Sequence, residues 1–308
     1  MPTSSSSPAR LALADLPLRL LAEHTRTITA MLGGAARSLL PGKRPGVTGT
    51  VMTQTVRAPS AELREAYATW CGAGTRYAQS TPPHLVCAKI TLPLVAQLTA
   101  QAPYALLSVL NQGVRLRLHA PLPVDEPIQL EGRLLDASDD GFRARIHSQV
   151  TVGTASVPQA ITIDAMAAVM LKKRPDSDNN RPATEPDYAT VATWQARAEE
   201  GQIFFWLTGD FNPIHTLPAF AKRTSFRGCI MHGYGAFAQV FEGLANSGAR
   251  IAEIEVRFVR PLPLPSPPLL IQRARTPDAD GRHAIRLVSA DDFTLFQVGH
   301  YLPAKETR

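Results

Sequence analysis

The chain has 308 residues, of which 44% are hydrophobic, and a formal net charge of +6 at pH 7. That length is enough for two domains with buried cores, and the absence of any run of about 18 uncharged apolar residues argues against a membrane-spanning helix. The Lys and Arg residues are scattered rather than gathered into one basic run with interleaved aromatics, which argues against nucleic-acid binding and leaves room only for a local anionic ligand.

The first predicted element is an amphipathic helical extension over residues 1–46. Its most apolar part, residues 11–40, is rich in Leu and Ala, but charged residues such as Asp15 and Arg19 interrupt it. The segment therefore lacks the continuous apolar region of a signal peptide. Attachment of this helix to a membrane surface is the alternative interpretation.

Beyond the extension, the sequence repeats itself at an offset of 140 residues. Identical residues at this offset include Thr50 and Thr190, Arg57 and Arg197, Arg117 and Arg257, Pro121 and Pro261, and Gly141 and Gly281. Because chance identities would not share one offset from end to end, we interpret the repeat as a duplication. Residues 47–171 form the first copy and residues 187–308 the second. Residues 172–186, rich in Pro, Asp, Asn and Lys, are predicted to be a linker.

Each copy is predicted to contain a short strand, a polar helix, a loop, a more apolar helix and then several strands. Alternation of apolar and charged side chains predicts strands over residues 114–118 and 254–258. The pairs Asp140-Gly141 and Asp280-Gly281 are hairpin-turn signals at equivalent places. An apolar helix followed by an antiparallel sheet that can wrap it indicates an α+β fold, with the two copies side by side.

Two neighbouring segments of the second copy form a recognisable motif. Residues 206–215 read Trp-Leu-Thr-Gly-Asp-Phe-Asn-Pro-Ile-His, and residues 227–233 read Arg-Gly-Cys-Ile-Met-His-Gly. This pattern resembles the hydratase motif of MaoC-like dehydratases and (R)-specific enoyl-CoA hydratases, Ser-Gly-Asp-x-Asn-Pro-x-His followed by Ile-x-His-Gly. The resemblance implies a double hotdog, in which each repeat is an antiparallel sheet wrapped around a central helix. It also implies reversible hydration of trans-2-enoyl thioesters to (R)-3-hydroxyacyl thioesters.

The resemblance assigns a role to each polar residue of the motif. Hydration needs a water activated near the β-carbon and a proton delivered at the α-carbon. In the family, the residues matching Asp210 and His215 hold that water, and the residue matching Asn212 supports the site. The backbone N–H of Gly233, at the start of the apolar helix, would bind the enolate oxygen. His232 is grouped with Gly233 in the oxyanion and substrate-binding part of the site, and it is expected to position the helix start by packing or a hydrogen bond; a second base is the alternative.

The first copy is predicted to be a degenerate, non-catalytic hotdog. At the offset of 140, Trp70, Gly72, Thr75 and Leu92 occupy the positions of Asp210, Asn212, His215 and His232. Neither Trp70 nor Thr75 can serve as a general base under ordinary conditions. This half is therefore expected to shape the acyl-chain pocket or to fill the core.

Two other functions stay open, a hotdog thioesterase and a catalytically silent subunit that binds acyl thioesters. The expected partner is a CoA or acyl carrier protein thioester of fatty acid metabolism, and a homodimer is compatible with the sequence. No metal or other cofactor is expected, because water, Asp and His suffice for the reaction. The odd number of cysteines, without metal-ligand spacing, indicates a reduced cytoplasmic chain; they are Cys71, Cys87 and Cys229. The remaining histidines, including His24 and His84, are assigned surface or structural roles.

Overall fold

The computed structural model describes residues 11–38, 48–104, 109–172 and 185–305. The first half contributes the strands β1 (Val51–Val56), β2 (Val109–Leu118), β3 (Ile128–Asp139), β4 (Arg143–Gly153) and β5 (Ile161–Met170). The second half contributes β6 (Tyr188–Trp194), β7 (Ile251–Phe258), β8 (Leu269–Ala274), β9 (His283–Ser289) and β10 (Leu295–Pro303).

All ten strands belong to one antiparallel sheet, in the order β1-β3-β4-β5-β2-β7-β10-β9-β8-β6. Read from either end, this order visits equivalent strands of the two copies, and the copies meet where β2 pairs with β7. The predicted strands over 114–118 and 254–258 lie in β2 and β7 and are confirmed. The predicted α+β fold of two repeats is also confirmed.

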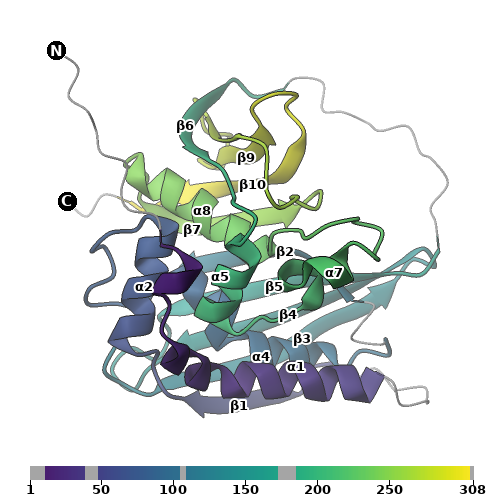
Figure 1. Ribbon diagram of the computed structural model, residues 1–308. Coiled ribbons are helices and arrows are strands. Elements are labelled where there is room, and N and C mark those ends of the chain that lie inside the picture. The colour runs from purple at the N-terminus through teal and green to yellow at the C-terminus, as the bar shows by residue number, and fades with distance from the viewer. Residues whose placement is uncertain (1–10, 39–47, 105–108, 173–184, 306–308) are drawn as a thin grey trace.

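The helices cover one side of this sheet (Figure 1). They are η1 (Leu13–Asp15), η2 (Leu18–His24), α1 (Thr25–Ser38), α2 (Ala61–Cys71), α3 (Pro83–Leu85), the π-helical η3 (Val86–Ile90), α4 (Leu92–Thr99), α5 (Glu200–Thr208), α6 (Pro213–Thr216), α7 (Pro218–Ala221) and α8 (Gly233–Asn246). Among the described helices, none is long and apolar enough to cross a membrane.

Each half packs an apolar helix against its own strands. In the first half, Leu94 and Leu98, one helical turn apart in α4, are fully buried against β3 and β4. In the second half, Phe237 and Leu244 of α8 are fully buried, and α8 packs on β6 and β8. The hairpins β3–β4 and β8–β9 turn at Gly141 and Gly281, both with positive φ, at the two predicted Asp-Gly signals.

The constant offset of 140 residues is wrong for the loop after the first helix of each copy. A glycine in the left-handed conformation ends this helix in both halves, Gly72 after α2 and Gly209 after α5. The counterpart of Asp210 is therefore Ala73 and not Trp70. Alanine has no group that could activate water, so the prediction of a non-catalytic first copy is retained for a different reason.

The start of the central helix also departs from that offset. Thr81 N donates to Leu122 O in the first half, as Met231 N donates to Leu262 O in the second. His232 therefore has Pro82 and not Leu92 as its counterpart. The chain between Gly72 and Pro83 is short and forms no helix, so the first copy lacks any equivalent of α6 and α7. Extra residues before Gly72 and between α3 and β2 together compensate for the shorter loop, which is why the sequences align without a gap.

The described part of the N-terminal extension forms η1, η2 and α1. Helix α1 runs beside α4, at the bottom of the view in Figure 1, and η2 contacts α5. The extension therefore touches both halves.

Most of the predicted linker, together with residues 1–10 and 39–46, lies outside the described residues, and the domain boundaries remain predictions.

Candidate active site

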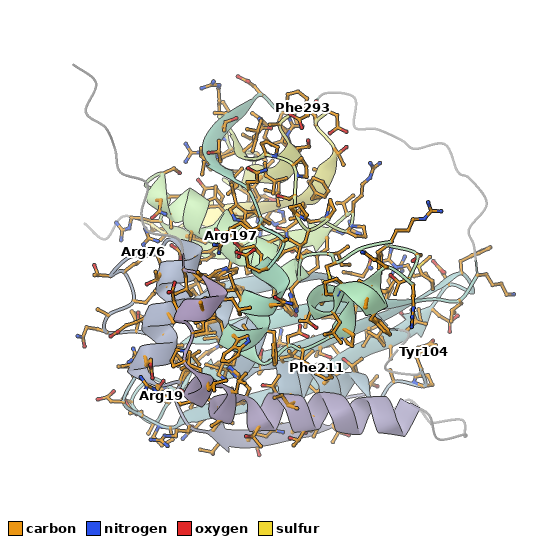
Figure 2. The ribbon with its side chains drawn as sticks, in the orientation of Figure 1. Arg19, Arg76, Tyr104, Arg197, Phe211 and Phe293 are labelled. Carbon is orange, nitrogen blue, oxygen red and sulfur yellow. The ribbon has the colours of Figure 1, made fainter. Side chains whose placement is uncertain are left out.

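The loop after α5 carries the predicted catalytic residues. The chain leaves α5 at Gly209, which has a φ of 82°, and Asp210 is the next residue. Asn212 then starts α6 as its N-cap, because its side-chain oxygen accepts from Ile214 N at 3.3 Å, with Pro213 in the first turn. This cap gives Asn212 a supporting role in the local geometry. Figure 2 labels Phe211, which marks this loop in the middle of the molecule, above α1.

Short contacts between α6 and α5 fix the position of His215. A Cβ at Gly201 of α5 would lie 2.0 Å from the carbonyl oxygen of His215, so only glycine allows the two helices to come this close. Gln202 Nε2 also donates to Thr216 O at 3.2 Å. Neither Gly201 nor Gln202 was singled out from the sequence, because their partners lie in the loop beyond.

The ring of His215 has a defined tautomer. Its Nδ1 lies 2.8 Å from Ile230 O and therefore donates to this carbonyl, which leaves the Nε2 lone pair as the acceptor of the neutral ring. The ring lies against that of His232, with centroids 3.8 Å apart and an interplanar angle of 33°.

His232 joins the loop to the start of α8. It is the N-cap residue of that helix and is only 2% exposed. Its Nε2 donates to the backbone oxygen of Asp210 at 2.9 Å and lies 4.0 Å from the carboxylate Oδ2 of the same residue. This hydrogen bond has the form expected of a residue that positions the helix start.

The first residue of α8 is Gly233, and a side chain at this position would be crowded by a neighbouring ring. A Cβ at this position would lie 2.7 Å from the ring of Phe258 in β7. The carbonyl of Gly233 accepts from Gln297 Nε2 at 3.1 Å. Because the first N–H groups of a helix have no intrahelical partner, the amide of Gly233 is suited to bind a developing negative charge.

Burial sets the protonation behaviour of the acid and the base. Burial raises the pKa of Asp210 above its ordinary value, and the nearby His215 partly opposes this rise. Burial lowers the pKa of His215, and Asp210 partly opposes that fall. The two pKa values are thereby moved toward one another, a perturbation that is common at functional sites.

Two other side chains could in principle act as a nucleophile or a base, Cys229 and Glu242, but both fit these roles less well. Burial raises the pKa of the Cys229 thiol, so its reactive thiolate form is disfavoured. The carboxylate of Glu242, on the central helix α8, lies among side chains of the first half. It forms an ion pair with Arg76 and accepts from His84 Nε2 at 2.8 Å and from Tyr77 OH at 2.7 Å.

The side chains around Glu242 form a second polar cluster, which is best described as a buried ion pair. Cys71, His84 and Glu242 place possible ligand atoms within 4.8 Å of one another. Burial alone would raise the pKa of Glu242, but its hydrogen bonds and the charges of His84 and Arg76 outweigh burial and lower it. With the Arg76 guanidinium already paired to this carboxylate, a cation at the cluster would meet repulsion.

Several buried polar residues could not have been found by motif spacing. His24 and His84 are fully buried, and each has a hydrogen-bond partner in the other half of the chain, 182 and 158 residues away. Trp70 fills the core, and its Nε1 donates to Glu200 Oε2 across the two halves at 2.8 Å. Only the folded chain brings these partners together.

Comparison with known proteins agrees with this geometry. Residues 171–267, which contain the whole loop and the start of α8, match the model of the MaoC like domain family. The chain is 28% identical over 151 residues to the peroxisomal hydratase-dehydrogenase-epimerase of Neurospora crassa, an alignment covering 45% of this chain and 17% of that protein. It is 29% identical over 166 residues to 3-hydroxyacyl-thioester dehydratase Y of Mycobacterium tuberculosis, covering 49% of this chain and 56% of the relative. Each alignment therefore spans less than two thirds of the relative.

Solved structures show the same fold at low sequence identity. HtdX of Mycobacterium tuberculosis superposes with a TM-score of 0.65 and 18% identity, covering 83% of this chain and all of that one. A second protein of that organism, described as having a double hotdog fold, superposes with a TM-score of 0.52 and 13% identity, covering 84% of this chain and 97% of that one. Residues 171–267 therefore match the MaoC like domain, and the chain as a whole has the double hotdog fold of these solved structures.

Proposed function

We propose that the chain is a hydro-lyase that reversibly hydrates trans-2-enoyl thioesters to (R)-3-hydroxyacyl thioesters. The observation that carries the proposal is the close contact of the His215 and His232 rings, with centroids 3.8 Å apart, while His232 itself donates to the backbone of Asp210. These contacts bring Asp210, His215 and the amino-terminal end of α8 close together, which supports the proposal. The names of the two relatives, a hydratase and a 3-hydroxyacyl-thioester dehydratase, support the same chemistry.

In the proposed reaction, Asp210 and His215 hold a water between them. As the water oxygen bonds to the β-carbon, one of its protons passes to this pair. The pair returns a proton to the α-carbon, so the net change is the addition of one water across the double bond. The negative charge that develops on the thioester oxygen is stabilised by the N–H of Gly233. The reverse sequence expels water.

The substrate class is an acyl thioester of CoA or of an acyl carrier protein, and no cofactor takes part in the proposed steps. A cytoplasmic location follows from the cysteine content, whereas the Neurospora relative is named as peroxisomal. The first half is assigned a supporting role in a chain with one active site, and a homodimer is the proposed assembly.

The test is a hydration assay with crotonyl-, octenoyl- and longer trans-2-enoyl-CoA, in which the chirality of the product is determined. Release of free thiol is followed in the same samples. The proposal predicts 3-hydroxyacyl-CoA of the R configuration without thiol release. Thiol release without hydration would support a thioesterase, and no reaction with any enoyl thioester would support a silent binding subunit.

A further inference from the structure

The N-terminal segment reaches the hydratase loop through one buried side chain. His24, the last residue of η2, is fully buried, and its Nε2 lies 2.6 Å from the carbonyl oxygen of Trp206. Trp206 belongs to the last turn of α5, where carbonyls have no partner within the helix. His24 therefore caps the C-terminal end of the helix that delivers Asp210.

The same histidine packs directly against the residue that precedes Asp210. A Cβ at Gly209 would lie 2.7 Å from the Cβ of His24 and 3.2 Å from that of Thr27. The turn that leaves α5 is therefore confined from outside by the N-terminal segment. A movement of His24 would change the space available to Gly209, and the next residue in the chain carries the carboxylate.

A buried lysine of the first half holds His24 in place. Lys89, in η3 and only 7% exposed, donates from Nζ to His24 Nδ1 at 2.6 Å and to Glu23 O at 3.0 Å. Burial lowers the pKa of His24 to about 4, and the charge of Lys89 adds to this effect, so the ring is neutral near pH 7. A neutral ring that accepts at Nδ1 must donate at Nε2, which is the hydrogen bond made to Trp206.

We propose that His24 is a positioning residue for Asp210 and that Lys89, from the non-catalytic half, fixes its orientation. This inference rests on the proposed hydratase function and deepens it. Through this chain of contacts, the first half and the N-terminal extension act on the active site without supplying a group that touches substrate. Loss of the hydrogen bond to Trp206 leaves the last turn of α5 less constrained, so Asp210 spends less time in the reactive geometry.

The first test compares His24→Leu, which removes both ring nitrogens, with His24→Gln, whose amide can again donate to the Trp206 carbonyl. Leu20→Ala is the control, since Leu20 is buried in the same segment and has no polar group to cap α5. His24→Leu is expected to lower kcat about tenfold or more with KM changed less than about threefold, and His24→Gln to recover most of the loss. Lys89→Met should lower kcat in the same way but less. Unchanged kcat in His24→Leu, or an equal loss in Leu20→Ala, would overturn the inference.

The second test does not depend on activity. Hydrogen–deuterium exchange of the backbone over residues 209–216 is measured for the same full-length variants, below the unfolding temperature of each. His24→Leu is expected to exchange faster there than wild type and Leu20→Ala. If wild type shows no hydratase activity, the proposed function fails while this measurement still decides the positioning role. Unchanged exchange in His24→Leu would refute that role whatever the activity.

Discussion

At the scale of single residues, Asp210 and His215 are the two proposed catalytic groups, and they are held in different ways. His215 is fixed by its hydrogen bond to Ile230, whereas the side chain of Asp210 is 17% exposed and lies where the loop leaves α5. Asp210→Asn and His215→Ala are each expected to lower kcat/KM by about 100-fold or more, the usual effect of losing a general acid or base. Circular dichroism checks that both variants remain folded. Turnover close to wild type in either would exclude the proposed roles.

The pH dependence of hydration follows from the same pair. Asp210 must be ionised to accept a proton, and burial raises its pKa above the ordinary value of 3.8. The rate is therefore expected to fall on acidification at a higher pH than an exposed aspartate would cause. The pKa of His215 is lowered below 6.5, so most of this side chain is still neutral at pH 6.5. A profile of kcat/KM measured from pH 4 to 9 tests this, and a rate that stays constant over the whole range would contradict it.

His24 links the site to stability in acid. Its pKa is about 4 in the folded chain against 6.5 for an ordinary histidine, so the unfolded chain binds the proton more tightly. Stability is then expected to fall as the pH is lowered from about 6.5 to about 4, by roughly 3 kcal/mol from this group. Urea unfolding of wild type and His24→Gln at pH 7 and pH 4.5 isolates the effect, because the variant lacks this titration. An equal loss in both would show that His24 is not buried as a neutral ring.

At the scale of elements, two equivalent glycines offer a matched comparison. Both end a helix in the left-handed conformation, and an alanine there costs about 1–2 kcal/mol. A Cβ at Gly72 would meet only Asn246 at 4.0 Å, whereas one at Gly209 would press on His24. Gly209→Ala is therefore expected to reduce the free energy of unfolding by more than Gly72→Ala does. Equal losses in urea denaturation would mean that the N-terminal segment does not pack on the loop.

Local signals in the sequence predicted the elements well but not the connections between them. Alternation located β2 and β7, and the Asp-Gly pairs located both hairpin turns, because these features depend on neighbouring residues. The alignment at a constant offset misplaced Trp70 and Leu92, because extra residues on both sides of the shorter loop compensate for its length. His24 was missed because the carbonyl that it caps is distant in the sequence.

At the scale of the whole molecule, the two halves share one sheet and several buried polar contacts. Figure 2 labels Arg76 near α2, and its partner Glu242 lies on α8 of the other half. Glu242 is 1% exposed, so its removal takes away a buried carboxylate that pairs with Arg76 and accepts from His84. Glu242→Ala is expected to cost about 3–5 kcal/mol.

The exposed ion pair Arg19–Glu62 supplies the control. Glu62→Ala breaks a surface pair that solvent screens, so a much smaller loss than in Glu242→Ala is expected. Urea denaturation of both variants tests the difference, and wild type is expected to unfold in one transition because the sheet is continuous through β2 and β7. Two separate transitions in wild type, or equal losses in the two variants, would show that the halves are energetically independent.

The most direct test of the central claim is the hydration of trans-2-enoyl-CoA by wild type and Asp210→Asn, followed side by side with separation of the 3-hydroxyacyl-CoA enantiomers. The predicted result is R product from wild type and a rate lower by about 100-fold or more from the variant. Equal rates for the two proteins, or S product from wild type, would contradict a hydratase built on Asp210 and His215.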